Sequence, residues 1–317
     1  MTAATEARPA YEAFSHEALL YESPAEFLDE TSHFVREGLD RDEAILVAVT
    51  GERSRWMREF FGGEDDVQIV DMAQLGANPA RIIPAWQEFL DHNLAQGRDV
   101  RGIGEPVWAG RSPAELAECQ QHESLLNLAF GDGPGWRLLC PYDVRGLPGS
   151  VIDEARATHP RVLASGDFVD SATYHPDSPL RALRREPLPP PAEPPTELAF
   201  TAGELASVRR LVSRRCEELG LHASAAEDLV LSVDEIAANS LLHGGGRGVL
   251  RVWADGDHLI CEVSDDGVIR NPLVGRERPS LDRTGGRGLW LANQLCDLVQ
   301  VRSGASGTVV RLHARIA

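Results

Sequence analysis

Residues 224–246 read SAAEDLVLSVDEIAANSLLHGGG, and this stretch predicts the helix around which the C-terminal part of the chain is organised. Ser224 with Glu227 three residues later has the form of a capping box, which is a start signal for a helix. Apolar side chains then recur at helical spacing and predict a face that packs against a core. Three consecutive glycines close the stretch and predict the end of the helix.

A second stripe of the same predicted helix is polar. Glu235, Asn239 and His243 are four residues apart, so their side chains stack along one face. The carboxamide oxygen of Asn239 is a hard ligand suited to Mg²⁺, and the carboxylate of Glu235 can take a proton or hold a metal-bound water. His243 is interpreted as a cation at the helix end, stabilised by the helix dipole, rather than as a reactant.

Two later motifs extend this pattern. Residues 263–268 close a strand-like run and place the carboxylate of Asp265 two residues before Gly267. Residues 285–289, GGRGL, open a helix-like run, and Thr308 follows a glycine in the last predicted strand. Glycine allows the backbone to approach a ligand closely, and a helix N-terminus favours phosphate.

In this order the four motifs resemble the ATP-binding domain of the GHKL (Bergerat-fold) ATPases. The helix that ends in His243 and the short stretch between the two glycine motifs resemble one branch, the anti-sigma-factor serine kinases. The resemblance covers residues 198–317 and implies an α/β two-layer sandwich that binds ATP and Mg²⁺. Motifs of this kind carry weight only in their structural context.

The resemblance also implies roles for individual residues. Asn239 would coordinate Mg²⁺, and Glu235 would activate the attacking hydroxyl or water. Asp265 would accept a hydrogen bond from the adenine amino group, with Gly267 letting the base approach. The remaining expected nucleotide contacts are Gly286, Gly288, Leu289 and Thr308, with Arg287 either pairing with phosphate or lying solvated in its loop.

The composition of the chain narrows the classes of function. All 31 basic residues are arginine, so the lysine of a P-loop and the strand lysine of eukaryotic-type protein kinases are both missing. The net charge is −18, of which residues 197–317, with 16 acidic and 14 basic residues, contribute only −2. This acidic balance argues against a nucleic-acid partner.

Five widely scattered cysteines and the lack of a secretory or membrane-spanning segment predict a reduced, cytoplasmic protein.

Residues 1–180 predict an α/β domain, because helix-like segments alternate with apolar runs such as residues 43–50. This part resembles the MEDS sensory domain, named for methanogen, methylotroph and DcmR-type sensors. The resemblance implies a RecA-like three-layer fold with a mainly parallel sheet and a small-molecule ligand. The residues that carry it are His16, Tyr21, 38–43, Gly104 to Trp108 (GEPVW), Cys140 to Asp143 (CPYD) and His159-Pro160.

Residues 181–197, RALRREPLPPPAEPPTE, are predicted to be a stiff proline-rich linker between the two domains. Beyond it, the sequence predicts a helix over residues 204–219, a hairpin at residues 255–257 and a mixed sheet. Residues 268–284 lack periodicity and contain two prolines, so they are interpreted as a mobile lid over the nucleotide.

Three alternatives remain open. Cys119 and His122 lie on one predicted helix and, with His16 or Cys140, could bind a metal or haem, whereas a buried thiol and a hydrogen-bonded histidine are commoner. The sequence around His16 is similar to the start of a histidine-kinase phosphoacceptor box, but the basic residue, the proline and the dimerising helices are missing. A non-catalytic ATP-dependent binding module is the third alternative.

The resemblance favours a serine/threonine-protein kinase that acts on a STAS-type anti-sigma-factor antagonist. It also implies a sigma factor as partner and a homodimer.

Overall fold

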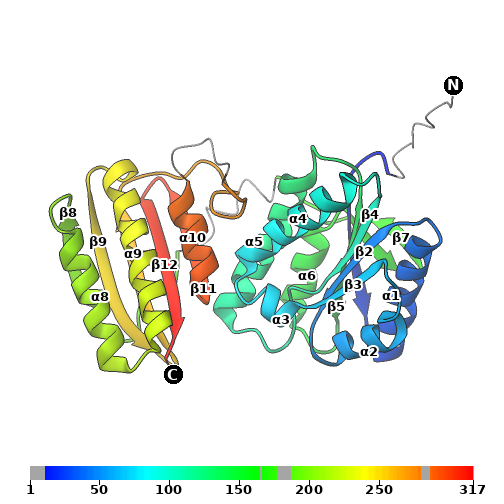
Figure 1. The fold of residues 1–317 in the computed structure, drawn as a ribbon, viewed down its shortest axis with the longest axis horizontal. Coiled ribbons are helices and arrows are strands. Elements are labelled where there is room, and N and C mark those ends of the chain that lie inside the picture. The colour runs from blue at the N-terminus through cyan, green and yellow to red at the C-terminus, as the bar shows by residue number, and fades with distance from the viewer. Residues whose placement is uncertain (1–10, 165, 178–186, 280–285, 317) are drawn as a thin grey trace. The chain divides into compact units, whose positions relative to one another are not determined.

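The computed structural model describes residues 11–164, 166–177, 187–279 and 286–316. The chain divides into two compact units, residues 1–179 and residues 180–317 (Figure 1). Within the described ranges, no helix is both long and apolar enough to cross a membrane.

The N-terminal unit alternates strands and helices along the chain. Its elements are β1 Ser15–Tyr21, α1 Pro24–Leu39, β2 Ala44–Val49, α2 Gly51–Phe61, β3 Val67–Asp71, α3 Met72–Leu75, η1 Pro79–Arg81, α4 Ile82–Leu94, β4 Val100–Gly104, α5 Pro113–Phe130, β5 Arg137–Asp143, α6 Gly149–Thr158, β6 Arg161–Ala164 and β7 Asp167–Asp170.

These strands form one sheet in the order β3-β2-β4-β5-β1-β6-β7, parallel except for the β6–β7 pair. Every residue of β2 is buried, as expected for a strand covered on both faces. Ile45 and Val47 pack with residues of α1 and α2. On the other face, Trp86 of α4 lies directly over Gly102 of β4, which pairs with Leu46. The structure confirms the predicted α/β fold with a mainly parallel sheet.

Strand β1 was not predicted from the sequence. It lies in the interior of the sheet, between β5 and β6, with Ala18 opposite Cys140 and Val162. Its sequence, SHEALLY, has the charged Glu17 as its third residue and an apolar run too short to predict a buried strand. Glu17 is nonetheless fully buried, because Arg137 and Arg161 pair with its carboxylate at 2.8 and 3.2 Å.

The C-terminal unit consists of β8 Thr196–Thr201, α8 Leu205–Leu219, α9 Ala223–His243, β9 Arg247–Asp255, β10 His258–Asp265, α10 Arg287–Leu295, β11 Leu298–Gly304 and β12 Gly307–Arg315. Its strands lie in the order β11-β12-β10-β9-β8, and all four pairings are antiparallel. The expectation of a mixed sheet is therefore wrong, because no pairing among these strands is parallel. Strand β8, which was not predicted from the sequence, pairs with β9 as an antiparallel edge strand. The three helices cover one face of the sheet (Figure 1), which confirms the predicted two-layer sandwich.

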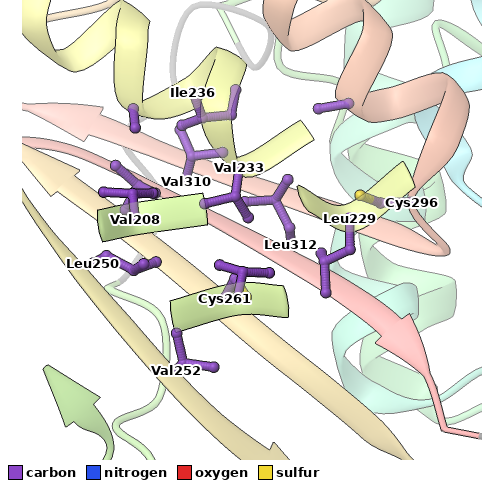
Figure 2. Close-up of a cluster of buried hydrophobic side chains, with 14 of the residues drawn as sticks. Val208, Leu229, Val233, Ile236, Leu250, Val252, Cys261, Cys296, Val310 and Leu312 are labelled. Carbon is purple, nitrogen blue, oxygen red and sulfur yellow. The ribbon is translucent and has the colours of Figure 1, made fainter. Parts of the chain in front are cut away.

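The core of this unit lies between α9 and the sheet. Figure 2 shows Leu229, Val233 and Ile236 of α9 facing side chains of the strands, among them Leu250 and Leu312. All five of these side chains are buried. Burying them leaves Glu235 and Asn239 on the flank of this apolar stripe, where both side chains are half-buried.

The start of α9 differs from the prediction. The N-cap is His222, with no side-chain capping bond, and the helix begins at Ala223. Ser224 therefore lies inside the first turn, where its hydroxyl is 2.9 Å from His222 Nδ1 instead of capping the helix with Glu227.

Two predicted connecting segments are described only in part. Of the linker predicted at residues 181–197, residues 181–186 lie outside the described residues, residues 187–195 form neither helix nor strand, and residues 196–197 begin β8. Of the predicted lid, residues 280–284 lie outside the described residues. Its first part, residues 268–279, forms turns in which Leu273 is buried.

Candidate functional site

The polar stripe of α9 is the first part of the site. Glu235 and Asn239 are half-buried, one turn apart, and His243 lies exposed in the last turn. Their side chains are held in place by the buried apolar stripe of the same helix, which fixes the rotation of α9 about its axis. A carboxylate and a carboxamide are thereby presented side by side on a rigid element.

Asp265, the last residue of β10, has its carboxylate fixed from two sides. The backbone N–H of Gly267 donates to Oδ1 at 2.8 Å, and the hydroxyl of Ser240 on α9 donates to Oδ2 at 2.6 Å. Charge-assisted hydrogen bonds of this length are among the stronger ones in proteins. The sequence analysis did not identify Ser240, and its only signal is that it follows Asn239 on the adjacent face of the helix.

A chain of hydroxyl groups holds the segment that follows β10. Thr308 Oγ1 on β12 donates to the carbonyl of Gly267 at 2.8 Å and lies 2.7 Å from Ser303 Oγ on β11. Ser303 Oγ in turn accepts the N–H of Ile269 at 2.8 Å. Because the proton of Thr308 goes to the carbonyl, the Ser303 hydroxyl must donate to Thr308. Thr308 therefore positions the backbone around Gly267, and Ser303 is a second residue that the sequence analysis missed.

The beginning of α10 closes the site against α9. Gly286, the N-cap, has a φ of 80°, a left-handed conformation that glycine adopts without steric cost. Gly288 has no room for a side chain, since a Cβ there would lie 2.9 Å from both Asn239 Nδ2 and Glu235 Oε2. The first turn of α10 thus lies directly against the two polar residues of α9.

These elements enclose a cavity of about 200 Å³. Six of the residues predicted from the sequence line it: Asn239, Asp265, Gly267, Gly286, Leu289 and Thr308. Much of the remaining wall is apolar, from Ile236, Val268, Ile269, Val274 and Val310, and His243 also contributes. Glu235, Arg287 and Gly288 do not line the cavity, although Gly288 approaches Asn239 and Glu235 as described, and Arg287 is exposed.

The described part of the predicted lid lies against α10. Asn293 Nδ2 donates to the carbonyl of Gly275 at 2.8 Å, and a Cβ at Gly275 would lie 2.7 Å from Leu289. Val274 at the same turn lines the cavity. This part of the segment therefore forms a wall of the cavity and is packed against a helix.

Comparison with known proteins agrees with both domains. Residues 15–160 match the family model described as MEDS, the methanogen/methylotroph, DcmR sensory domain. Residues 198–314 match the model of the histidine kinase-like ATPase domain. The chain therefore carries a MEDS domain followed by a histidine kinase-like ATPase domain.

Among solved structures, the chain is similar to the RsbU and RsbW domains of Rv1364c from Mycobacterium tuberculosis, with 19% sequence identity and a TM-score of 0.30. The match covers 39% of this chain and 32% of that one, so the chain spans about a third of the length of that protein.

Proposed function

We propose that the ATPase domain binds Mg-ATP and transfers its γ-phosphoryl group to a serine or threonine of a small partner protein, under the control of the MEDS domain. The partner is a STAS-type anti-sigma-factor antagonist, and the domain alternately binds and holds a sigma factor. The family match supports ATP binding and a kinase-like role in general.

The observation that carries this proposal is the meeting of three elements at one cavity. Helix α9 brings Asn239 to the cavity wall, with Glu235 one turn away, and the end of β10 brings the fixed carboxylate of Asp265. Gly286 at the start of α10 also lines the cavity, and Gly288 beside it contacts the α9 pair. An apolar cavity with a few convergent polar groups is the usual form of a small-molecule site.

The residues present suit the nucleotide and the metal. Asp265, held by Ser240 and Gly267, is an acceptor for an exocyclic amino group, and the apolar wall suits a planar base. At about 200 Å³ the cavity is smaller than the roughly 300–1,000 Å³ of whole-ligand pockets, so it fits the base while the phosphates extend toward α10. Carboxamide and carboxylate oxygens on α9 are the donors that Mg²⁺ prefers, and the N-terminus of α10 favours phosphate.

The chemistry assigned to the chain is proton transfer and positioning. Glu235 accepts the proton of the partner's serine or threonine hydroxyl. The hydroxyl oxygen bonds to the γ-phosphorus of ATP as the bond from this phosphorus to ADP breaks. Asn239 would hold Mg²⁺, and the ion would offset negative charge on the phosphates. No lysine is required, in keeping with a chain whose basic residues are all arginine.

The MEDS domain is assigned the regulatory part. It contains a cavity of about 330 Å³ lined by charged side chains from α1 and the sheet, including Glu37, Arg137 and Arg161. This cavity is where we place a small polar ligand. All five cysteines are free and buried, which supports a reducing compartment such as the cytoplasm.

Autophosphorylation of His16 is disfavoured by its position. The side chain is 1% exposed in the interior strand β1, and both ring nitrogens contact other side chains, Asn127 at 3.2 Å and Glu123 at 3.1 Å. A phosphoryl donor has no access to such a nitrogen.

Calorimetry and phosphotransfer together test the proposal. Asn239→Ala should weaken Mg-ATP binding by at least about tenfold, the effect of losing roughly 1.4 kcal/mol. Glu235→Gln should keep nucleotide binding and lower transfer to a candidate antagonist by about 10²–10⁴-fold. Asp234→Asn is the matched control, because Asp234 pairs with Arg209 at 2.9 Å and does not line the cavity.

Two results would reject parts of this function. Wild-type protein that binds neither Mg-ATP nor Mg-ADP would remove the nucleotide site altogether. Binding that depends on Asn239, with no phosphoserine or phosphothreonine on any candidate, would favour the non-catalytic binding module.

A further inference from the structure

Four buried side chains of the MEDS domain converge on one point. His16 of β1, Glu123 of α5, Cys140 of β5 and His159 at the end of α6 each offer one ligand atom, and these atoms all lie within 4.8 Å of one another. Each residue is at most 1% exposed. The cluster thus joins two neighbouring parallel strands and two helices at a site closed to solvent.

The members of this cluster differ from those expected from the sequence. His16 and Cys140 are present, but Cys119 is not, since its thiol lies 3.1 Å from the carbonyl of Pro106. His122 is not a member either. Glu123 and His159, far apart in sequence from His16, complete the set.

The proton on His159 can be placed from its neighbours. Nδ1 lies 2.7 Å from the carbonyl oxygen of Ala155, and a carbonyl only accepts, so Nδ1 carries the hydrogen. A neutral His159 therefore points the lone pair of Nε2 into the cluster, where Glu123 Oε2 lies 3.2 Å away. An unprotonated nitrogen facing a carboxylate oxygen is repulsive.

His16 is fixed in the same way through one more residue. Asn127 Nδ2 donates to the carbonyl of Thr158 at 2.7 Å, so Asn127 Oδ1 faces His16 Nδ1 at 3.2 Å and accepts its hydrogen. The Nε2 lone pair of neutral His16 then also faces Glu123 Oε2, at 3.1 Å. One carboxylate oxygen is approached by two nitrogen lone pairs.

A positive charge at the centre would resolve this conflict. Protonating both rings places two buried cations together with ring centroids 3.9 Å apart, which is costly. A single extra proton satisfies one contact with Glu123 and leaves the other repulsive. One divalent cation satisfies all four groups, and with a Cys140 thiolate and the Glu123 carboxylate its charge is neutralised.

We propose that His16, Glu123, Cys140 and His159 bind one Zn²⁺ ion. Bond lengths of about 2.0–2.3 Å in a tetrahedron separate neighbouring ligand atoms by roughly 3.3–3.6 Å. The measured separations are 3.1 and 3.2 Å from Glu123 Oε2 to the two nitrogens and 3.4 Å from Cys140 Sγ to His16 Nε2. A mixed sulfur, nitrogen and oxygen set of four, closed to water, is typical of zinc rather than of Mg²⁺ or Ca²⁺.

The surrounding hydrogen bonds have the pattern of metal sites. Each ring donates its Nδ1–H to an acceptor, Ala155 O for His159 and Asn127 Oδ1 for His16. Such outer contacts fix the tautomer and the ring orientation before the metal arrives. Asn127 and Glu123 are one turn apart on α5, so one helix face supplies both a ligand and a supporting residue.

Elemental analysis of the full chain, purified without chelator, tests the proposal. We expect one zinc per chain, without any need for nucleotide. The protein loaded with Co²⁺ instead should show thiolate-to-cobalt charge transfer in the near ultraviolet and the visible bands of tetrahedral cobalt.

Three variants locate the site. Cys140→Ser should remove the charge-transfer band, and Asn127→Leu should weaken metal binding by about 10–100-fold through the ring it orients. Cys119→Ser is the matched control, a buried thiol on α5 that should keep the metal. If Cys140→Ser does not fold, the cobalt spectrum of the wild type and the metal affinity of Asn127→Leu still test the proposal.

Specific results would overturn the assignment. A wild-type chain that contains no metal and takes up neither Zn²⁺ nor Co²⁺ from buffered solution rejects the site. Zinc retained in full by Cys140→Ser and Asn127→Leu shows that the ion binds elsewhere. One equivalent of iron in place of zinc, lost in Cys140→Ser, rejects the choice of metal.

Discussion

At the scale of single residues, the presentation of Asp265 depends on Ser240. The Ser240 hydroxyl lies 2.6 Å from Asp265 Oδ2 and 3.2 Å from the carbonyl of Ile236, so its one proton goes to the nearer carboxylate. This bond fixes the carboxylate in the plane where a base amino group would meet it. Pre-orientation of this kind strengthens binding, because less freedom is lost when the ligand arrives.

We therefore expect Ser240→Ala to weaken Mg-ATP and Mg-ADP binding about tenfold, from the loss of roughly 1.5 kcal/mol of a hydrogen bond to a charged group. Calorimetry measures this directly. Ser232→Ala is the control, because Ser232 is a buried serine on the same helix two turns earlier and its hydroxyl has no hydrogen-bond partner among the described residues. Equal nucleotide affinities of Ser240→Ala and wild type would show that Asp265 does not need this contact.

A substitution at Gly288 should affect nucleotide binding without lowering the stability of the fold. An added methyl group would lie 2.9 Å from Asn239 Nδ2 and Glu235 Oε2, which are the mobile ends of their side chains, and 3.2 Å from Glu235 Cβ. Gly288→Ala should therefore displace both functional groups and weaken nucleotide binding by at least about tenfold. The thermal midpoint should not fall, since alanine is about 1 kcal/mol more favourable than glycine inside a helix.

The control for this variant is Gly304→Ala, at the end of β11, where a Cβ meets nothing within 4 Å. A Gly288→Ala protein that unfolds at much lower temperature would mean that the first turn of α10 cannot adjust, and the interpretation of a purely local displacement would be wrong.

At the scale of elements, the strongly periodic segments could be predicted from sequence and the others could not. Helix α5 has Ser112 as its N-cap, and there the Ser-x-x-Glu pattern forms a capping box with Glu115. At α9 the same signal, Ser224 with Glu227, does not cap, because the preceding chain already turns into the helix at His222. A capping pattern specifies a start only where the backbone before it is extended.

The candidate site shows the same division. Residues on motifs, such as Asn239 and Asp265, could be named from the sequence because the order of the motifs resembles that of the GHKL ATPases. Ser240 and Ser303 were not predicted, because their partners are 25 and 5 residues away in sequence and meet them only after the sheet has formed. For the same reason His159 was not predicted to join His16, 143 residues earlier in the chain.

Glu105 couples three elements of the MEDS domain. Directly after β4, its carboxylate accepts the N–H and hydroxyl of Thr50 at 3.0 and 3.1 Å and pairs with Arg53 of α2 at 2.5 Å. Burial nevertheless raises the pKa of Glu105 to about 7, and the nearby Arg53 opposes this only in part. A carboxyl whose pKa is raised on folding stabilises the fold most when it is protonated.

The sign of the pH dependence follows. The contribution of Glu105 is fully present below about pH 4.5 and is lost as the pH rises to about 7. The stability of wild type relative to Glu105→Gln should therefore fall by up to about 1.4 kcal/mol per pH unit across this window. Urea unfolding at several pH values measures it, with the exposed Glu22→Gln as control. A difference that rises with pH would show that the ion pair with Arg53 dominates over burial.

At the scale of the whole molecule, the exclusive use of arginine has a structural counterpart. Two buried carboxylates of the MEDS domain are each paired with a guanidinium group, Glu43 with Arg101 and Glu17 with Arg137. The guanidinium of Arg101 also donates to the carbonyl of Phe34, at 2.5 Å, and to Glu37, so one side chain serves several acceptors. A lysine ammonium lacks this planar fork and could not make the same set of bonds.

Regulation by the MEDS domain requires that nucleotide binding in the ATPase domain also changes the stability of the MEDS domain. Mg-ATP at about 100 times its Kd should stabilise the ATPase domain by roughly 2.7 kcal/mol, and the stability of a coupled MEDS domain should change as well. Hydrogen exchange of the full chain, with and without Mg-ATP, measures the protection of backbone amides in both domains in one experiment. We expect slower exchange around residues 236–244 and 265–275, at the cavity, and a second change within residues 15–160.

The Asn239→Ala protein at the same nucleotide concentration is the control and should show neither change. Protection confined to the ATPase domain at full nucleotide occupancy would contradict regulation through the nucleotide-bound state, because coupling between two sites is reciprocal.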